Sequence, residues 1–266
     1  MDHRPQNWGR PRDDIYGGYD VSYMAPNAEP NTHTQSPVVT GTSVVALKYK
    51  DGVIMAADNL ASYGSLARFP SVQRLMPFAD TSVLGFSGDV SDMQYISRHL
   101  TSLSIDEAYG VQDPLNAANL HRYLSKLLYS RRSKFDPLWN NILIAGFDSD
   151  DKPFLASADL LGTTYSSPSL ASGYGSMLAQ PIMRKYASTE EDAAKLTKEQ
   201  AIKIVKECMK VLFYRDARSL DKYSLAVVTR KSGEEGGGGV QITQEKLEGM
   251  SWKFADRIKG YGTQTV

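Results

Sequence analysis

The sequence is poor in cysteine and histidine. Its 266 residues include one cysteine, Cys208, and four histidines. A lone cysteine cannot form an internal disulfide, which fits a reducing compartment. No two of these residues have the spacing of metal ligands. The glycine run at residues 236–239 lacks the Lys-Ser/Thr pair that a phosphate-binding loop needs. We therefore expect neither a metal nor another cofactor.

The sequence also lacks net charge and long apolar runs. Thirty Lys and Arg balance thirty Asp and Glu, so no overall field would hold the chain on nucleic acid or an anionic membrane. The longest apolar runs, at residues 53–57 and 142–147, are far too short to span a bilayer. The first thirty residues contain no stretch typical of a secretory signal. We expect no nucleic-acid or membrane partner, and a location in the cytoplasm and nucleus.

Three segments of the chain differ in composition. Residues 1–41 hold five of the twelve prolines, one tryptophan and three tyrosines, without sustained periodicity. Such a segment predicts an extended N-terminal arm that has no core of its own but could contact a partner. Regular apolar patterns extend over residues 42–246, which predicts the folded domain. Residues 247–266 follow the last predicted strand and form a C-terminal extension.

The order of the predicted elements indicates packed sheets with helices outside. Apolar runs bounded by turn residues predict strands, and apolar residues spaced three and four apart predict helices. Strands are expected at 44–49, 53–58, 74–78, 82–88, 141–147, 153–158, 163–167, 223–229 and 240–246, and helices after Ser91, after Pro114, over 176–186 and from a capping box at Thr197. Strands, two helices, strands, two helices and strands in this order favour sheets covered by helices.

Five blocks of the sequence carry a resemblance to a known family. The blocks are 41–49, 51–58, 85–89, 171–175 and 214–219, in the right order over roughly residues 41–230. With these blocks the chain resembles beta-type subunits of the 20S proteasome, which are N-terminal nucleophile hydrolases. Residues 8–11, 58–65 and 258–263 are most similar to the non-catalytic seventh beta type of fungi. The resemblance implies an α+β fold, a four-layer αββα sandwich, and a propeptide that ends at Gly41.

The resemblance also implies where an active site would lie. Active members expose a threonine, here Thr42, and place a lysine on the third strand, because a hydroxyl is a poor nucleophile without a base. The lysine position holds Arg74, which stays protonated and whose bulky fork we expect where the hydroxyl and the substrate carbonyl would meet. Two further positions depart from the family: its arginine is Leu60 here, and the serine of a Gly-Ser-Gly loop is Tyr174.

The remaining family positions are intact. Thr42, Asp58, Asp216 and Ser219 match by position, and we interpret them with Arg74 as remnants of a degenerate site, in which the carboxylates pair with Arg74 and cap local backbone. No catalytic residue is therefore predicted. One alternative is that Thr42 is an active protease nucleophile. Another is a standalone amidohydrolase for a small molecule, which would leave the arm and the extension without a use.

The function implied by the resemblance is structural. The chain would be a non-catalytic assembly subunit of the beta ring of the 20S core particle, supporting ubiquitin- and ATP-dependent protein degradation by active neighbours. Its partners would be other alpha and beta subunits and, indirectly, assembly chaperones and the regulatory particle. Self-cleavage before Thr42 needs the missing base, so we expect an active neighbour to cut the arm upstream, within residues 31–36.

The C-terminal extension is rich in large apolar side chains. It carries Met250, Trp252, Phe254, Ile258 and Tyr261 after the last predicted strand. The first three alternate with polar or small residues, which is typical of an added edge strand or an extended clamp. We expect the extension to contact neighbouring subunits or the opposite beta ring. The alternative is that it folds back on its own body.

Overall fold

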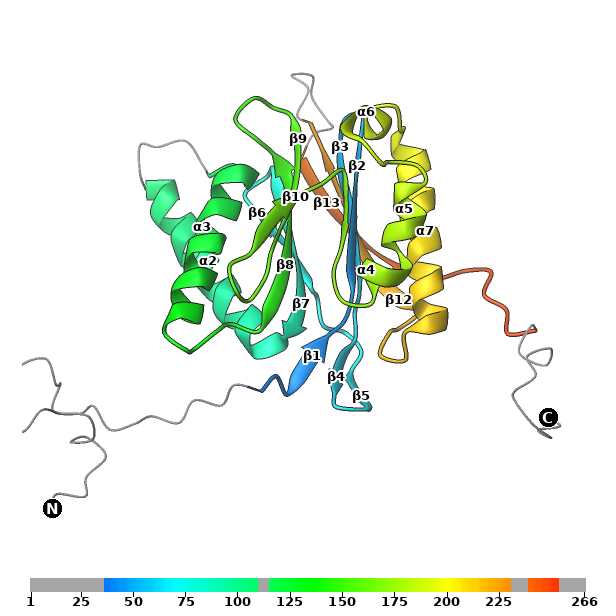
Figure 1. The fold of residues 1–266 in the computed structure, drawn as a ribbon, viewed down its shortest axis with the longest axis horizontal. Coiled ribbons are helices and arrows are strands. Elements are labelled where there is room, and N and C mark those ends of the chain that lie inside the picture. Colours follow the sequence, from blue (N-terminus) through cyan, green and yellow to red (C-terminus); the bar gives the residue numbers. More distant parts are fainter. Residues whose placement is uncertain (1–35, 110–114, 231–238, 254–266) are drawn as a thin grey trace, which may run out of the picture. The chain divides into compact units, whose positions relative to one another are not determined.

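The computed structural model describes residues 36–109, 115–230 and 239–253. They form a body of four layers, in which α2 and α3 cover an eight-stranded sheet and α4 to α7 cover a five-stranded sheet (Figure 1). This order confirms the predicted αββα sandwich. Within the described residues, no helix is both long and apolar enough to cross a membrane.

The five-stranded sheet is antiparallel and has the order β11-β2-β3-β12-β13. Its strands are β2 (Val44–Tyr49), β3 (Gly52–Asp58), β11 (Ser169–Ala171), β12 (Lys222–Thr229) and β13 (Gly239–Lys246). A tight turn joins β2 to β3, as predicted, so Tyr49 pairs with Gly52. A Cβ atom at position 52 would lie 1.9 Å from the carbonyl oxygen of Val228. Only glycine therefore lets β12 approach this turn.

The eight-stranded sheet has the order β10-β9-β8-β7-β1-β4-β5, and β6 also pairs with β7. Its strands are β1 (Val39–Gly41), β4 (Ala61–Tyr63), β5 (Leu66–Phe69), β6 (Leu75–Phe78), β7 (Ser82–Asp89), β8 (Asn140–Phe147), β9 (Pro153–Ala158) and β10 (Thr164–Ser166). One edge of β7 pairs with β6 as far as Gly85 and then with β1 from Gly88. The strand β1 therefore lies beside the end of β7, on the edge that β6 leaves free.

Two long helices, α2 and α3, cover one face of the sandwich, and one long helix, α7, covers the other together with three short ones. The helices are α2 (Val90–Tyr109), α3 (Ala117–Ser133), α4 (Gly175–Leu178), α5 (Gln180–Arg184), α6 (Glu190–Ala193) and α7 (Lys198–Arg215). The predicted capping box of α7 is present, since the Thr197 side chain accepts from the backbone of Gln200 and the Gln200 side chain accepts from the backbone of Thr197. The helix predicted over 176–186 is divided at Ala179, two residues before Pro181.

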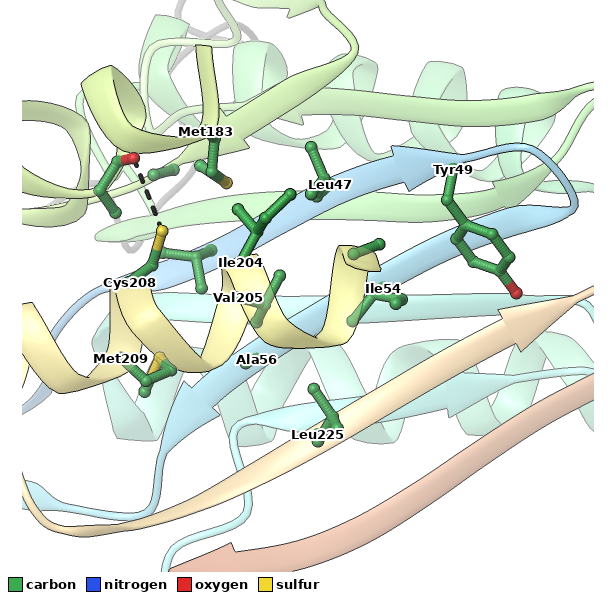
Figure 2. Close-up of a cluster of buried hydrophobic side chains, with 14 of the residues drawn as sticks. Leu47, Tyr49, Ile54, Ala56, Met183, Ile204, Val205, Cys208, Met209 and Leu225 are labelled. Atoms are coloured by element: carbon green, nitrogen blue, oxygen red, sulfur yellow. Dashed lines mark hydrogen bonds between the residues drawn. The ribbon is translucent and has the colours of Figure 1, made fainter. Parts of the chain in front are cut away.

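Three apolar cores separate the four layers. Alternate residues of β2 serve two of them, because Val44 and Ala46 face the core between the sheets while Leu47 and Tyr49 face the helix layer. This two-sided burial explains why β2 is a continuous apolar run rather than an alternating one. Figure 2 shows the second core, in which α7 places Ile204, Val205, Cys208 and Met209 over β2, β3 and β12. A third core lies between the larger sheet, α2 and α3.

Several short elements were not predicted from the sequence. They are β1, β4, β5, β11 and α6, each three or four residues long. The strand β1 lies at the end of the segment 1–41, so the folded domain begins before the predicted boundary at residue 42. Three residues carry no measurable period, and their conformation is fixed by pairing with β4 and β7. Residues 1–35 of the predicted arm, and residues 231–238, which include most of the glycine run, lie outside the described residues.

The described part of the C-terminal extension, residues 247–253, lies against α7. Leu247 is buried and Met250 packs against the α7 core. The ammonium group of Lys210 donates to the carbonyl oxygen of Gly249 at 2.8 Å, and the Trp252 ring meets Tyr214 edge-on, with 5.1 Å between centroids. For these residues the chain follows the alternative, folding back on its own body, because α7 offers an aromatic surface. Phe254, Ile258 and Tyr261 lie outside the described residues.

Candidate functional site

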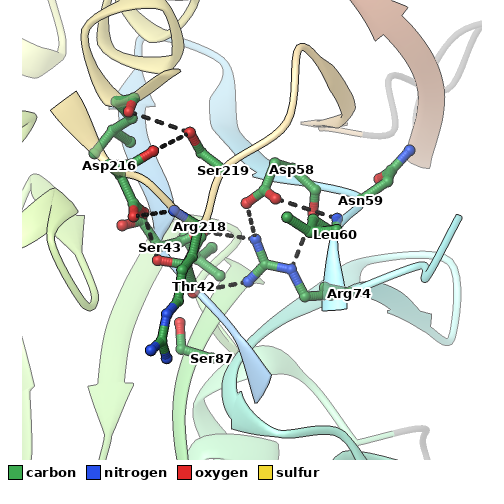
Figure 3. A network of polar contacts seen from close by, with 12 residues as sticks. Thr42, Ser43, Asp58, Asn59, Leu60, Arg74, Ser87, Asp216, Arg218 and Ser219 are labelled. Atoms are coloured by element: carbon green, nitrogen blue, oxygen red, sulfur yellow. Dashed lines mark hydrogen bonds and ion pairs between the residues drawn. The ribbon is translucent and has the colours of Figure 1, made fainter. Parts of the chain in front are cut away.

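Arg74 occupies the centre of the candidate site, immediately before β6. Its side chain is only 1% exposed, yet all five N–H donors of the guanidinium are used. The Nε atom donates to the carbonyl oxygen of Asp58 at 2.9 Å, Nη1 donates to those of Thr42 (2.8 Å) and Phe86 (3.0 Å), and Nη2 donates to that of Ser43 (2.9 Å) and to Asp58 Oδ1 (2.5 Å) (Figure 3). The cation therefore joins the end of β3 and the strand β7 to the two residues that link β1 to β2.

Asp58 is the counter-ion of Arg74. It ends β3, is buried, and also accepts the backbone N–H of Leu60 at 3.1 Å. Burial raises the pKa of the Asp58 carboxyl above its usual value, while the Arg74 guanidinium acts in the opposite direction. Leu60 stands where the family has an arginine and brings no charge to this pair. The pair is thus a closed unit of one cation and one carboxylate.

Gly41 packs directly against the Arg74 side chain. A Cβ atom at position 41 would lie 2.4 Å from Cδ of Arg74 and 3.1 Å from Nε. Carbon atoms do not approach each other this closely without displacement. The glycine before Thr42 is therefore required by the packing of Arg74, whatever its role in cleavage.

Thr42 contacts Asp216 and not Arg74 through its side chain. The Thr42 hydroxyl donates to Asp216 Oδ2 at 2.6 Å, and the backbone N–H of Arg218 donates to Asp216 Oδ1 at 2.9 Å. The expectation that both carboxylates pair with Arg74 is therefore wrong for Asp216, because the guanidinium has no donor left. Ser219 also lies apart from Thr42: its hydroxyl donates to the carbonyl oxygens of Asp216 (2.7 Å) and Leu212 (3.4 Å).

Three serines beside Thr42 were missed from the sequence. The Ser43 hydroxyl accepts the N–H of Gly175 at the start of α4, and the Ser172 hydroxyl accepts the N–H of Val44 at 3.0 Å. The Ser87 and Ser172 hydroxyls are hydrogen-bonded to each other. Single serines carry no periodic signal, although all three belong to blocks that matched the family. This network fixes the loop before α4 to the start of β2.

A cleft of about 570 Å³ opens next to Thr42. Its walls include Thr42, Ser87, Trp139, Tyr174 and Met177. Arg74 is not among the residues that line it. The prediction that the guanidinium fills the space beside the Thr42 hydroxyl is therefore wrong. The guanidinium donates instead to the backbone carbonyl oxygens of residues 42 and 43 and does not line the cleft. Tyr174, in place of the family serine, projects from the rim and is mostly exposed.

The strand β1 fills the slot that leads to Thr42. Thr40 pairs with Ser62 of β4 on one side and with Asp89 of β7 on the other, and Gly41 pairs with Gly88. The N–H of Val38 also donates to Asp89 Oδ1 at 3.2 Å. A second extended peptide cannot add to these same strand edges while β1 is in place.

The proton-accepting groups at this site are limited. As long as the chain is uncut before Thr42, the Thr42 nitrogen belongs to a peptide bond and is not an amine, and arginine does not lose its proton in proteins. The acceptor that the Thr42 hydroxyl meets is the Asp216 carboxylate, and a carboxylate is a far weaker base than an amine. No group of three His, Cys, Asp or Glu side chains in the described part of the chain is placed to hold a metal ion.

The chain matches known proteins over its whole length. It is 46% identical over 271 residues to "Proteasome subunit beta type-7" of Saccharomyces cerevisiae, with both chains fully covered. It is 47% identical over 262 residues to "Probable proteasome subunit beta type-7" of Schizosaccharomyces pombe, covering 97% of each chain. It is 41% identical over 237 residues to "Proteasome subunit beta type-4" of Xenopus laevis, covering 89% of this chain and 93% of that one.

The family comparison agrees with the fold. The profile described as "Proteasome subunit" matches residues 38–228. This match begins one residue before β1 and ends within β12, so it includes Thr42, Asp58, Arg74 and Asp216. The chain therefore belongs to the proteasome subunit family, and within it to the beta type.

Proposed function

We propose that the chain is a non-catalytic structural and assembly subunit of the beta ring of the 20S proteasome, in the cytoplasm and nucleus. It would support ubiquitin- and ATP-dependent protein degradation by active neighbours. Membership of the family implies assembly with other proteasome subunits. The finer assignments, a degenerate site and a purely structural role, rest on the geometry around Arg74.

The single observation that carries the proposal is the environment of Arg74. Its five N–H donors all point to fixed acceptors, four of them backbone carbonyl oxygens. A proton relay must accept and release a proton within reach of the hydroxyl. A permanently charged guanidinium that is saturated by carbonyl groups does neither, which supports a structural role for the residue.

The position of β1 supports the same proposal. An active N-terminal nucleophile needs a free Thr42 amine and an empty slot for the substrate strand. In the structure β1 pairs with β4 on one side and with β7 on the other, and so occupies that slot. We propose that an active neighbour cuts the arm upstream of β1, within residues 31–36, and that β1 stays in the sheet.

The proposal is tested by replacing the hydroxyl that an active site would need. Thr42→Ala in the assembled particle should leave every peptidase activity within about 20% of the wild type, because no bond is attacked by this hydroxyl. The matched control is the same threonine-to-alanine change at the N-terminal residue of an active beta subunit, which should abolish one activity. Loss of any activity in Thr42→Ala particles of normal yield would overturn the non-catalytic assignment.

One observation favours the alternative, an active Thr42. Its side chain lines the open cleft and is hydrogen-bonded to a carboxylate at 2.6 Å. If that carboxylate activated the hydroxyl, a threonine-directed covalent inhibitor would label Thr42 in purified particles. We expect labelling of the active subunits only, and a labelled peptide that begins at Thr42 would favour the alternative.

A further inference from the structure

The hairpin β4–β5 exposes three large apolar side chains close together. Every residue from 63 to 71 is exposed, and among them Tyr63, Leu66 and Phe69 are 56%, 58% and 43% exposed. Val38, at the entry to β1, is 50% exposed. Single exposed apolar residues are ordinary, but three gathered on one hairpin are not.

The hairpin is a regular element and not a loose loop. Tyr63 pairs with Leu66 across the two-residue turn formed by Gly64 and Ser65, and Ser62 pairs with Ala67. Gly64 has φ +58°, the left-handed conformation that such short hairpin turns require. The hairpin extends below the rest of the body in Figure 1. Its apolar side chains are therefore held out in fixed positions.

The exposed side chains continue a face that is buried elsewhere in the molecule. Val39 pairs with Tyr63, and Tyr63 pairs with Leu66, so the three lie on one face of the sheet. Val39 packs against the core that α2 and α3 cover over β7 and β8. The helices therefore cover this face as far as Val39 of β1 and Ala61 of β4, and leave Tyr63 and the strand β5 uncovered.

A small groove adjoins the hairpin where the cover ends. It has a volume of about 260 Å³ and lies between Val39 of β1, Phe69 of β5 and the start of α2, with Val72 and Val90 in its walls. A groove of this size accepts one apolar side chain from outside. Beyond it, β5 is the last strand of the sheet in the described structure, so its outer edge can pair with another strand.

The charge on this surface has one sign. Arg68 is the one charged residue between positions 59 and 73, and its guanidinium lies 5.3 Å from the centre of the Phe69 ring. It forms no ion pair with any described residue. A guanidinium placed over an aromatic ring can still donate its N–H groups to a carboxylate. Two copies of this hairpin in contact would bring two such cations together, which disfavours pairing between identical chains.

We propose that the hairpin Ala61–Phe69 is an inter-subunit contact, which inserts into a different subunit of the proteasome that presents an apolar surface bordered by a carboxylate. Tyr63, Leu66 and Phe69 would be buried by the partner, and the carboxylate would bind Arg68. This inference rests on the proposed function, since it needs the assembled particle. A second copy of this chain and the chain's own residues 1–35 are other possible occupants, and the experiments below distinguish them.

The first experiment replaces the apolar side chains. Leu66→Asp with Phe69→Asp should reduce incorporation of the full-length chain into particles at least tenfold on native gels, because two charges would be buried against an apolar surface. The matched control is Ser65→Asp, which adds a charge to the same hairpin at the turn, and it should reduce incorporation less than twofold. Both variants should show the far-UV circular dichroism of the wild type, since none of these side chains is in a core. Normal incorporation of the double variant would overturn the proposal.

The second experiment identifies the occupant. A photo-crosslinking amino acid at position 66, in particles purified intact, should link this chain to one other proteasome subunit beside an Asp or Glu. Arg68→Glu should then lower the yield of particles, and exchange of that acidic residue for lysine should restore it. A crosslink to a second copy, to residues 1–35 of the same chain, or to nothing would contradict the proposal. If the wild-type chain does not co-purify with particles, the proposed function fails; if it does and position 66 stays unlinked, only this inference fails.

Discussion

Charged side chains are usually exposed and large apolar ones buried, and Arg74 and the β4–β5 hairpin depart from this rule in opposite directions. Arg74 is a charged residue with 1% of its surface exposed, and Leu66 and Phe69 are apolar residues that face outward. Each Arg74 donor has its acceptor within the chain, while the hairpin side chains have no comparable cover from described residues. The comparison separates what the chain stabilises by itself from what it leaves for a partner.

The two regions therefore fail in different ways when they are changed. Alterations at Arg74 should appear in the stability of the isolated chain, because its interactions are internal. Alterations in the hairpin should leave that stability unchanged and appear only on assembly. Changes at residues whose interactions lie within the chain test the first of these two expectations.

The largest effect is expected for Arg74→Ala. The substitution leaves the Asp58 carboxylate buried without its cation and removes the donors that Arg74 supplies to four carbonyl oxygens, so the free energy of unfolding should fall by about 3–5 kcal/mol. The free energy of unfolding of Arg74→Lys should lie between those of Arg74→Ala and the wild type, since an ammonium keeps the charge but has three donors instead of five. Arg98→Ala, at an exposed arginine of α2, is the control and should cost less than about 0.5 kcal/mol. Urea denaturation of the full chain measures all three.

A smaller effect is expected for Gly41→Ala. The new methyl group would lie 2.4 Å from Cδ of Arg74, and overpacking of this kind costs about 1–3 kcal/mol. The cost should shrink in an Arg74→Ala background, because the clashing atoms are gone. Gly64→Ala is the control: it has nothing within 4 Å and only its positive φ to strain it, so its cost should not depend on residue 74. Equal costs of Gly41→Ala in both backgrounds would rule out the contact.

The half-exposed pair between α7 and β13 should contribute less still. Burial raises the pKa of Glu245, but hydrogen bonds from Lys206 and Tyr223 outweigh it and leave the pKa below its usual value. A carboxyl with a lowered folded pKa stabilises the fold above its unfolded pKa, near 4.3, and this stabilisation is lost as the pH falls through the folded pKa. Glu245→Gln should remove less than about 1 kcal/mol at pH 7, and nothing at a pH well below 4. A loss that persists in acid would point to packing rather than charge.

The smallest effect is expected at Cys208. Burial raises the pKa of its thiol to about 12, and the sulfur lies in the α7 core, 3.7 Å from the carbonyl oxygen of Ala179 (Figure 2). Because the thiolate is the reactive form, iodoacetamide at pH 8 should leave Cys208 unmodified in the native chain. Mass spectrometry after one hour should show alkylation only when urea is added, and rapid labelling without it would mean that the core opens.

The predictability of the fold follows the length of its elements. The strands β2 and β3 and the helix α7 were predicted because six or more residues repeat one pattern, and α7 adds a capping box. The strand β1 was missed because three residues at the end of a proline-rich segment show no period, and their place is set by Ser62, Gly88 and Asp89 from elsewhere in the chain.

The candidate site was predictable in its composition but not in its contacts. A resemblance aligned Thr42, Asp58, Arg74 and Asp216, and the structure brings them together. The resemblance gave no information on which acceptors the Arg74 guanidinium would bind. Those acceptors are mainly backbone carbonyl groups, which every residue has, so no side chain in the sequence marks them. For the same reason Asp216 could not be assigned to the Thr42 hydroxyl in advance.

The central claim is that the chain retains its peptide bond before Thr42, with β1 held in the sheet and Gly41 packed on Arg74. The most direct test is the N-terminal residue of this chain in particles purified intact, measured by mass spectrometry of the whole subunit. The account predicts a terminus upstream of Val39, with the 41–42 bond unbroken. A chain that begins with a free Thr42 amine would contradict it.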